Sequence, residues 1–312
     1  MAEQTYIRSY PQNSLHTLLL LGALAGCGVG AITSSHEEDA RPDAGPPSSD
    51  AGSTPSPDAA PPSPDAAPPA PDAAPPGEVW RPSPGTSWQW QLTGSLDTSL
   101  DVDMYDIDLF DNSTSAIAGL KADGRIVICY FSAGSREDWR PDADDFPASV
   151  IGDPLDGWDG ECWLDIRSAA VRDIMRARLD LAASKGCDGV EPDNVDGYTN
   201  SPGFPLTAQD QLDYNRFLAA EAHARGLSIG LKNDVDQVNA LVDDFDWALN
   251  EECFQYHECD MLEPFVAAGK AVFSVEYGSA GTADSICPQA NALDFDTLIK
   301  HLDLDAWRIA CR

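Results

Sequence analysis

The chain of 312 residues has few basic side chains and few histidines, and it lacks the short motifs of several large enzyme classes. Its five histidines are scattered, and none stands at H-x-H or H-E-x-x-H spacing, which argues against a zinc hydrolase. No G-x-S-x-G motif is present, which argues against an α/β-hydrolase. Neither of the common glycine-rich phosphate loops occurs, so the sequence gives no sign of a nucleotide cofactor, and we expect none.

The sequence also lacks an apolar run long enough to anchor it in a bilayer. Residues 18–25 are apolar but too short to span one, which is typical of an export signal. The run ends in Leu-Ala-Gly-Cys, which resembles the lipobox of bacterial lipoproteins, and the resemblance implies lipidation of Cys27. The alternative is an ordinary secretory signal in which Cys27 is incidental. Either reading predicts a signal peptide over residues 1–27 and an extracytoplasmic protein.

A proline-rich segment follows the signal. Residues 56–76 repeat seven-residue units, SPDAAPP, SPDAAPP and APDAAPP, and proline at this density favours extended polyproline II without a packed core. We therefore expect residues 28–77 to be a disordered tether and residues 78–312 to form the folded domain.

Negative charge dominates that domain. Residues 31–77 hold eight acidic side chains and Arg41, so residues 78–312 carry −26 of the formal charge of −33. Such a field repels nucleic acid and anionic membranes, and it attracts cations or polycationic substrates. We expect a monomer that binds a cationic polysaccharide, with no nucleic-acid partner and membrane contact only through the N-terminal lipid.

Apolar runs of strand length alternate with helical patterns along the domain. This alternation predicts an α/β fold, a (β/α)8 TIM-type barrel, with an open doubly wound sheet as the alternative. The helical patterns cover 169–183, 208–225, 237–241 and 261–268. The predicted strands cover 103–110, 125–132, 163–166, 189–193, 228–232, 247–251, 271–277 and 307–310.

The segment GCDGVEPDNVDGY, residues 186–198, is the most informative in the chain. Because strand side chains alternate, Glu191 and Asp193 should share one face while Val190 points the other way. An acidic cluster at the carboxyl end of a strand is typical of barrel active sites. A solvated acidic loop or a calcium site is the alternative.

Other predicted strands also end in polar residues, which indicates a polar pocket or, alternatively, a structural ion network around Lys232. No metal triad is evident, and two carboxylates flanking a sugar bond are the usual requirement of glycoside hydrolysis. The alternatives are a non-catalytic carbohydrate-binding barrel and a metal-dependent hydrolase built on Asp106/Asp108 and Asp193/Asp196. The strand-end residues in question are Asp106, Asp108, Tyr130, Trp163, Asp165, Lys232, Glu251, Glu252, Glu276 and Tyr277.

Together with CYFSAG, WLDIR, GLKND, NEECFQYHEC and VEY, this segment resembles glycoside hydrolase family 114, the endo-α-1,4-polygalactosaminidases, from about Trp88 to the C-terminus. The resemblance implies a (β/α)8-type fold and hydrolysis of α-1,4 links in galactosamine-rich polysaccharide. It implies Asp193 as the nucleophile and Glu251 as the acid/base. The expected sugar-binding shell comprises Asp108, Tyr130, Asp165, Glu191, Asn194, Asp196, Tyr198, Lys232 and Glu276.

Glu251 carries one ambiguity. It is in phase with Trp247 and Leu249, which we expect to face the helices, so Glu252 is an alternative acid/base.

Eight cysteines minus a lipidated Cys27 leave an odd number, so at least one thiol should be free. We expect disulfides Cys253–Cys259 and Cys287–Cys311 and a buried free thiol at Cys129. Cys162 and Cys187 begin neighbouring predicted strands, where they are placed to meet.

Overall fold

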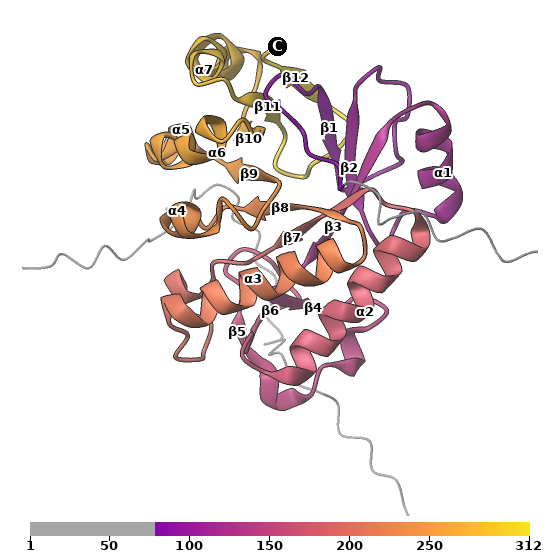
Figure 1. Cartoon of the computed structure of the whole chain (residues 1–312), viewed down its shortest axis with the longest axis vertical. Coiled ribbons are helices and arrows are strands. Elements are labelled where there is room, and N and C mark those ends of the chain that lie inside the picture. Colours follow the sequence, from indigo (N-terminus) through magenta and orange to yellow (C-terminus); the bar gives the residue numbers. More distant parts are fainter. Residues whose placement is uncertain (1–78) are drawn as a thin grey trace, which may run out of the picture. The chain divides into compact units, whose positions relative to one another are not determined.

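Eight parallel strands form a nearly closed barrel with helices on its outside, in the computed structural model, which describes residues 79–312 (Figure 1). The (β/α)8 TIM-type fold predicted from the sequence is therefore confirmed. The predictions of a signal peptide, lipidated Cys27 and tether lie outside the described residues. The strands of the large sheet, in spatial order, are β1 (Trp88–Gln91), β2 (Met104–Asp108), β3 (Ile126–Ser132), β7 (Gly189–Asp193), β8 (Ser228–Lys232), β9 (Trp247–Glu251), β10 (Val272–Tyr277), β11 (Asp296–Lys300) and β12 (Arg308–Ala310).

The helices have local sequence signals at their ends. The α3 helix begins after Thr207, which forms a capping box with Asp210, and α2 begins after Ser168 and ends at Gly186 in the left-handed region, with φ 89°. The helices are α1 (Thr114–Ala122), α2 (Ala169–Lys185), α3 (Ala208–Ala224), α4 (Val238–Leu241), α5 (Cys253–Tyr256), α6 (Glu263–Ala267) and α7 (Ala280–Ala292). No helix within residues 79–312 is long and apolar enough to cross a membrane.

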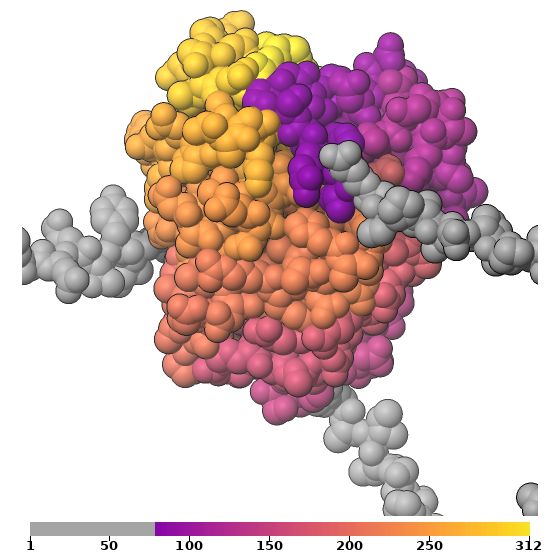
Figure 2. Space-filling model, viewed as in Figure 1, coloured from indigo at the N-terminus to yellow at the C-terminus, as the bar shows by residue number. Residues whose placement is uncertain are grey.

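The last strand fills the gap between β11 and the start of the domain. β12 pairs antiparallel with β11, so the prediction of a final parallel strand over 307–310 was wrong in direction. Arg308 donates from its guanidinium to the carbonyl of Trp88, and the backbone N of Leu92 donates to Leu304 at 3.0 Å. The indigo beginning of the domain is accordingly packed against its yellow end in the space-filling view (Figure 2).

A second, three-stranded antiparallel sheet is inserted between β3 and α2. It has the order β4 (Ser135–Glu137), β6 (Glu161–Leu164) and β5 (Ile151–Pro154). The prediction that 163–166 forms a barrel strand was therefore wrong, because β6 pairs with its own hairpin neighbour β5 and with β4. The true additional barrel strands are β1 and β11. The sequence did not predict them because neither is a continuous apolar run. β1 alternates tryptophan with glutamine, and β11 has a charged residue at each end.

The barrel has an aromatic interior that is distinct from the core under the helices. Trp88, Trp90, Trp247, Leu249 and Phe273 belong to the interior cluster, whereas Val190, Ile229 and Ala248 belong to the larger cluster that includes helix side chains. The expectation that Trp247 and Leu249 face the helices was therefore wrong. Glu251 alternates in step with Trp247 and Leu249 and therefore points into the barrel. Strand alternation thus no longer argues against Glu251 as the acid/base.

Gly230 makes room for Trp247 inside the barrel. A β-carbon added at Gly230 would lie 2.3 Å from Cζ3 of the Trp247 indole, which is itself wedged against Phe273 at a centroid distance of 5.4 Å. We expect Gly230→Ala to destabilise the protein by about 1–3 kcal/mol, since a close-packed core cannot absorb the methyl group without strain. Chemical denaturation measures this.

Gly281→Ala in α7 is the matched control. The atom nearest to its added β-carbon is the Ser279 hydroxyl at 3.9 Å, so this change should leave stability unchanged or raise it by about 0.5–1 kcal/mol. Equal stabilities for the two variants would contradict the packing described for Trp247.

Three disulfides lie within the described residues. The two expected pairs, Cys253–Cys259 and Cys287–Cys311, are present with Cα–Cα distances of 4.8 and 4.9 Å. The third joins Cys129 to Cys187 at 6.1 Å, so the predictions of a free Cys129 and of a Cys162–Cys187 pair were wrong. Cys129 points into the layer under the helices, where the chain entering β7 passes, and Cys162 is not a free thiol either. Disulfides in this number indicate an extracytoplasmic protein.

Candidate active site

A single buried lysine joins the carboxyl ends of three neighbouring barrel strands. Lys232 is the last residue of β8 and is 1% exposed. Its Nζ lies 2.8 Å from Oε1 of Glu191, 3.2 Å from Oδ1 of Asp193 and 3.3 Å from Oε2 of Glu251. The motif residues on β7 and the glutamate on β9 therefore meet at one point, at the mouth of the barrel.

The shared lysine limits how far apart the two outer carboxylates can be. Oδ1 of Asp193 and Oε2 of Glu251 both contact the same nitrogen, so these two oxygens are at most 6.5 Å apart, the sum of the two distances. Both side chains remain partly open to solvent, at 18% and 25%, while Glu191 is fully buried. A substrate can therefore reach Asp193 and Glu251 but not Glu191.

The three carboxylates keep Lys232 charged. Burial alone would lower the pKa of Lys232, but the negative charges of Asp193, Glu191 and Glu251 outweigh it and raise the pKa well above its ordinary value. The ammonium group also lies 4.8 Å from the ring centroid of Trp90, within the range of a cation–π contact. Lys232 is thus a fixed positive charge under the two exposed acids.

Beneath this centre lies a buried carboxyl pair. Glu191 accepts hydrogen bonds from Lys232 and from the indole N–H of Trp90 at 3.0 Å. Burial, followed by the charge of Glu191, raises the pKa of Asp106 well above its ordinary value, which favours a protonated Asp106 that donates a hydrogen bond to Glu191. This role explains why neither oxygen of Asp106 has a donor among the described residues.

Asp193 is held by two donors besides Lys232. The hydroxyl of Tyr130 donates to Oδ2 at 2.9 Å, and the backbone N of Asn194 donates to Oδ1 at 2.8 Å. Asn194 adopts a left-handed conformation, with φ 59°, and its side chain donates to the hydroxyl of Ser132 at 2.9 Å. These contacts fix the carboxylate at the end of β7.

Glu251 is held by the strands on either side of it. The hydroxyl of Tyr277, at the end of β10, donates to Oε1, and the side-chain amide of Asn233 donates to Oε2 at 3.3 Å. Asn233 also accepts the backbone N–H of Glu251 at 3.0 Å. The sequence analysis missed Asn233, although it directly follows Lys232 in the GLKND motif.

Glu252 does not take part in this arrangement. It adopts a left-handed conformation, with φ 62°, and precedes α5, and its backbone N donates to Val275 at 2.7 Å. Burial and the neighbouring charge of Glu251 raise the pKa of Glu252 above its ordinary value. The strand has ended by Glu252, so Glu251 rather than Glu252 contacts Lys232.

Three residues of the predicted binding shell are engaged elsewhere. Asp108 is 2% exposed and forms a bidentate ion pair with Arg140 at 3.0 and 2.6 Å. Asp165 pairs with Arg167 at 2.7 Å, and Glu276 accepts the backbone N–H of Phe254 at 2.9 Å, at the start of α5. The contacts of Asp108, Asp165 and Glu276 are structural, and we do not carry these residues into the proposed site.

The loop after Asp193 is supported by a buried acid on the loop after β8. The side chain of Asn215 donates to the carbonyl of Val195 at 3.0 Å and to Asp234 at 2.8 Å. Burial and the charge of Asp196 raise the pKa of Asp234 to about 9, and Tyr198 also hydrogen-bonds to it. Tyr198, predicted to bind substrate, thus contributes to this support, whereas Asp196, also predicted to bind substrate, adds a like charge near Asp234.

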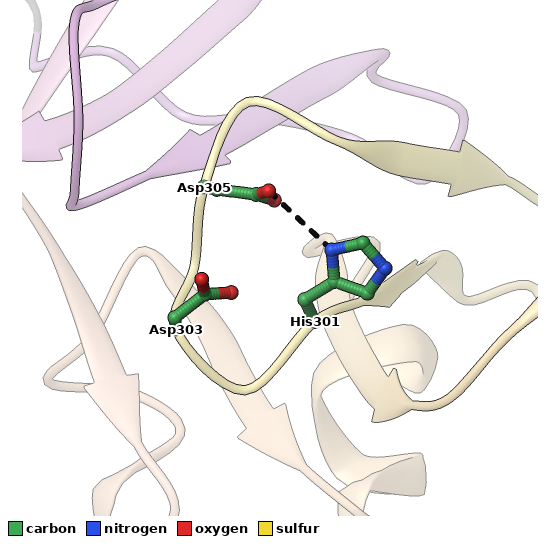
Figure 3. Close-up of side chains that lie close together, drawn as sticks. All are labelled: His301, Asp303 and Asp305. Carbon is green, nitrogen blue, oxygen red and sulfur yellow. Dashed lines mark hydrogen bonds and ion pairs between the residues drawn. The ribbon is translucent and has the colours of Figure 1, made fainter.

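A separate group of side chains has the composition of a metal site. His301, Asp303 and Asp305 lie on the loop after β11, with ligand atoms within 4.8 Å of one another, and His301 and Asp305 point toward each other across the loop (Figure 3). His301 also stacks on Trp307 at a centroid distance of 4.0 Å. Exposed acidic groups on one loop do not by themselves define a site. Within residues 79–312, the sets Asp106/Asp108 and Asp193/Asp196 do not form such a group.

A (β/α)8 barrel with two accessible, facing carboxylates at its carboxyl mouth has the architecture of a glycoside hydrolase. Comparison with known proteins identifies the family. The profile of glycoside-hydrolase family GH114 matches residues 69–312, and the chain belongs to this family. It is a glycosidase, similar to the endo-α-1,4-polygalactosaminidases.

The solved structures similar to the chain include one from Aspergillus fumigatus and one from Pseudomonas aeruginosa. Aspergillus fumigatus Ega3, crystallised in complex with galactosamine, is 49% identical with a TM-score of 0.72, over 74% of this chain and 97% of that one. The glycoside hydrolase domain of PelA from Pseudomonas aeruginosa is 13% identical with a TM-score of 0.59, over 72% and 98%, and shows the fold alone. The search of curated proteins gives no match.

Proposed function

We propose that the chain hydrolyses α-1,4 links between galactosamine residues of a cationic polysaccharide, with Asp193 and Glu251 as the catalytic pair. The observation that carries the proposal is that both carboxylates, at the ends of β7 and β9, contact the same buried Lys232 of the intervening strand β8 within 3.3 Å while staying open to solvent. A sugar bond placed over them would have one carboxyl group on each side.

In the proposed reaction, an oxygen of Asp193 attacks the anomeric carbon as the bond to the leaving sugar breaks. Glu251 gives its proton to the departing oxygen, and the sugar stays covalently attached to Asp193. Glu251 then takes a proton from water, whose oxygen attacks the anomeric carbon and releases Asp193. Tyr130 orients the nucleophile, and Tyr277 and Asn233 orient the acid/base.

The separation of the carboxylates favours retention of configuration. Retaining glycosidases hold their carboxyl groups about 5–5.5 Å apart, whereas inverting enzymes leave about 6.5–9.5 Å for a water molecule. The two lysine-bound oxygens are at most 6.5 Å apart, which is the smallest separation of the inverting range. Any shorter separation lies below that range and favours retention. Moving the pair farther apart would break at least one contact with Lys232.

Charge and similarity both support the substrate. The domain carries −26, and a de-N-acetylated galactosamine polymer is cationic, so the long-range field attracts it. Ega3, at 49% identity, was crystallised with galactosamine. The disulfides agree with an enzyme that meets polysaccharide outside the cytoplasm, and we propose that it acts there as a monomer.

An assay of released reducing ends tests the function. The enzyme should cleave de-N-acetylated α-1,4-galactosamine polymer and leave neutral glucans intact, and added chelator should not reduce the rate. Binding of the polymer without any release of ends would contradict hydrolysis and indicate a carbohydrate-binding barrel. Loss of activity in chelator would instead indicate a metal-dependent hydrolase.

A further inference from the structure

The face of the small sheet that meets the barrel carries a carboxylate with no cationic partner. Glu161, the first residue of β6, is 7% exposed, and its donor among the described side chains is the hydroxyl of Ser135 at 2.7 Å. A neutral hydroxyl supplies one hydrogen bond but no charge. The sequence analysis missed Glu161, because it assigned β6 to the barrel wall.

Glu161 stands directly across from a second acid. In the register of β4 and β6, Glu137 is its cross-strand partner, so both side chains project from the same face of the sheet. Glu137 is 2% exposed and uses Oε1 to bind Arg140 at 2.7 Å, while its Oε2 is buried with no hydrogen-bond partner. Like charges in this position repel each other, and Glu137 shares the positive charge of Arg140 with Asp108, so the two glutamates carry more negative charge than Arg140 can balance.

A short chain of hydrogen bonds connects Glu161 to the catalytic centre. Ser135 shares a hydrogen bond of 2.6 Å with Ser132, and the side chain of Asn194 donates to Ser132 at 2.9 Å. Asn194 in turn donates its backbone N–H to Asp193. Burial, followed by the charges of Glu137 and Asp193, raises the pKa of Glu161 to about 7. Glu161 is therefore at the same mouth of the barrel as Asp193, and a nearby cation would complete its ionisation.

We propose that Glu161 binds the ammonium group of a galactosamine residue next to the bond that is cleaved, and so selects free-amine over N-acetylated sugar. This inference rests on the proposed function. An ammonium group supplies the positive charge that Glu161 lacks and offsets the repulsion between Glu161 and Glu137 across the two strands. An acetamido group is neutral and larger, and it would leave the two buried carboxylates uncompensated.

Glu161→Gln tests the assignment, because glutamine keeps the shape and an acceptor oxygen for Ser135 but removes the charge. We expect KM for the de-N-acetylated polymer to rise about ten- to a hundredfold, the worth of a charged hydrogen bond, with little change in kcat. Affinity for galactosamine in titration calorimetry should fall similarly, and affinity for N-acetylgalactosamine should not. Asp159→Asn, the same charge change at an exposed position two residues earlier, should alter neither value.

Other results would overturn the inference. A fall in kcat with KM unchanged would mean that Glu161 only positions Asn194 and Asp193, and unchanged kinetics would remove it from the site. Glu161→Asp, which keeps the charge, should retain part of the preference for free amine, and losing all of it would also contradict the proposal. Failure of the wild-type enzyme to cleave the polymer would refute the proposed function, whereas loss of galactosamine binding in Glu161→Gln would still support the subsite.

Discussion

Replacing Asp193 with Asn is expected to lower kcat on galactosamine polymer by about three orders of magnitude or more, with affinity for the polymer unchanged or increased. Asparagine keeps the size of the side chain and can still accept from Tyr130, but it cannot form the glycosyl ester. Glu251→Gln should lower kcat by about 10²–10⁴-fold, because the leaving oxygen loses its proton donor. Reducing-end kinetics and equilibrium binding together measure both effects.

The binding measurement separates catalysis from structure. Loss of an interaction made only in the transition state lowers kcat and kcat/KM equally and leaves ground-state binding intact. Azide should partly rescue Asp193→Gly by attacking the anomeric carbon in place of the carboxylate. Glu252→Gln is the control, and its rate should be close to that of the wild type with and without azide. Near-normal turnover in Asp193→Asn would remove the proposed mechanism.

Lys232→Met is expected to abolish activity and to destabilise the protein by about 3–5 kcal/mol, because it removes the positive charge from a buried group of acids. Glu191 is fully buried and would lose the ammonium 2.8 Å away, and Asp193 and Glu251 would lose the contact that holds them together. Since the folded pKa of Lys232 is raised, its stabilisation is fully present below its unfolded pKa of about 10.4 and is lost only above that.

Lys121→Met is the matched control for this variant. Lys121 also forms a close ion pair, with Asp188 at 2.7 Å, but its side chain is 39% exposed. Removing it should cost no more than about 1 kcal/mol, and activity should be unchanged. Denaturation at neutral pH compares the two variants, and an equally small effect for Lys232→Met would contradict a buried ion cluster.

The catalytic end of the barrel could be predicted from sequence because strand alternation is strict there. Glu191, Asp193 and Lys232 lie on short strands with apolar neighbours on the opposite face, and the structure brings all three together. Glu251 shows the limit of the same rule. The sequence shows that Glu251 shares a strand face with Trp247 and Leu249, but it does not show whether that face points into the barrel. Trp247 fits inside the barrel because Gly230, on the neighbouring strand, leaves room for its indole.

Elements whose partners are distant in sequence could not be predicted in this way. Apolar content in β6 suits a barrel strand and a hairpin equally, and its pairing with β4 depends on a turn that the pattern does not encode. The roles of Asp108 and Asn233 likewise follow from contacts with Arg140 and with the backbone of Glu251. An acid at a strand end predicts a polar mouth, but whether it contacts substrate or an arginine is decided by tertiary packing.

The anomeric form of the first product tests the central claim that Asp193 and Glu251 act as a nucleophile and an acid/base. Proton NMR during the first turnovers of an α-1,4-galactosamine oligosaccharide shows the newly formed reducing end before it mutarotates. The account predicts that the α-anomer appears first, because two inversions through a glycosyl–Asp193 intermediate retain configuration. Initial release of the β-anomer would contradict it, since Asp193 would then be a base that activates water.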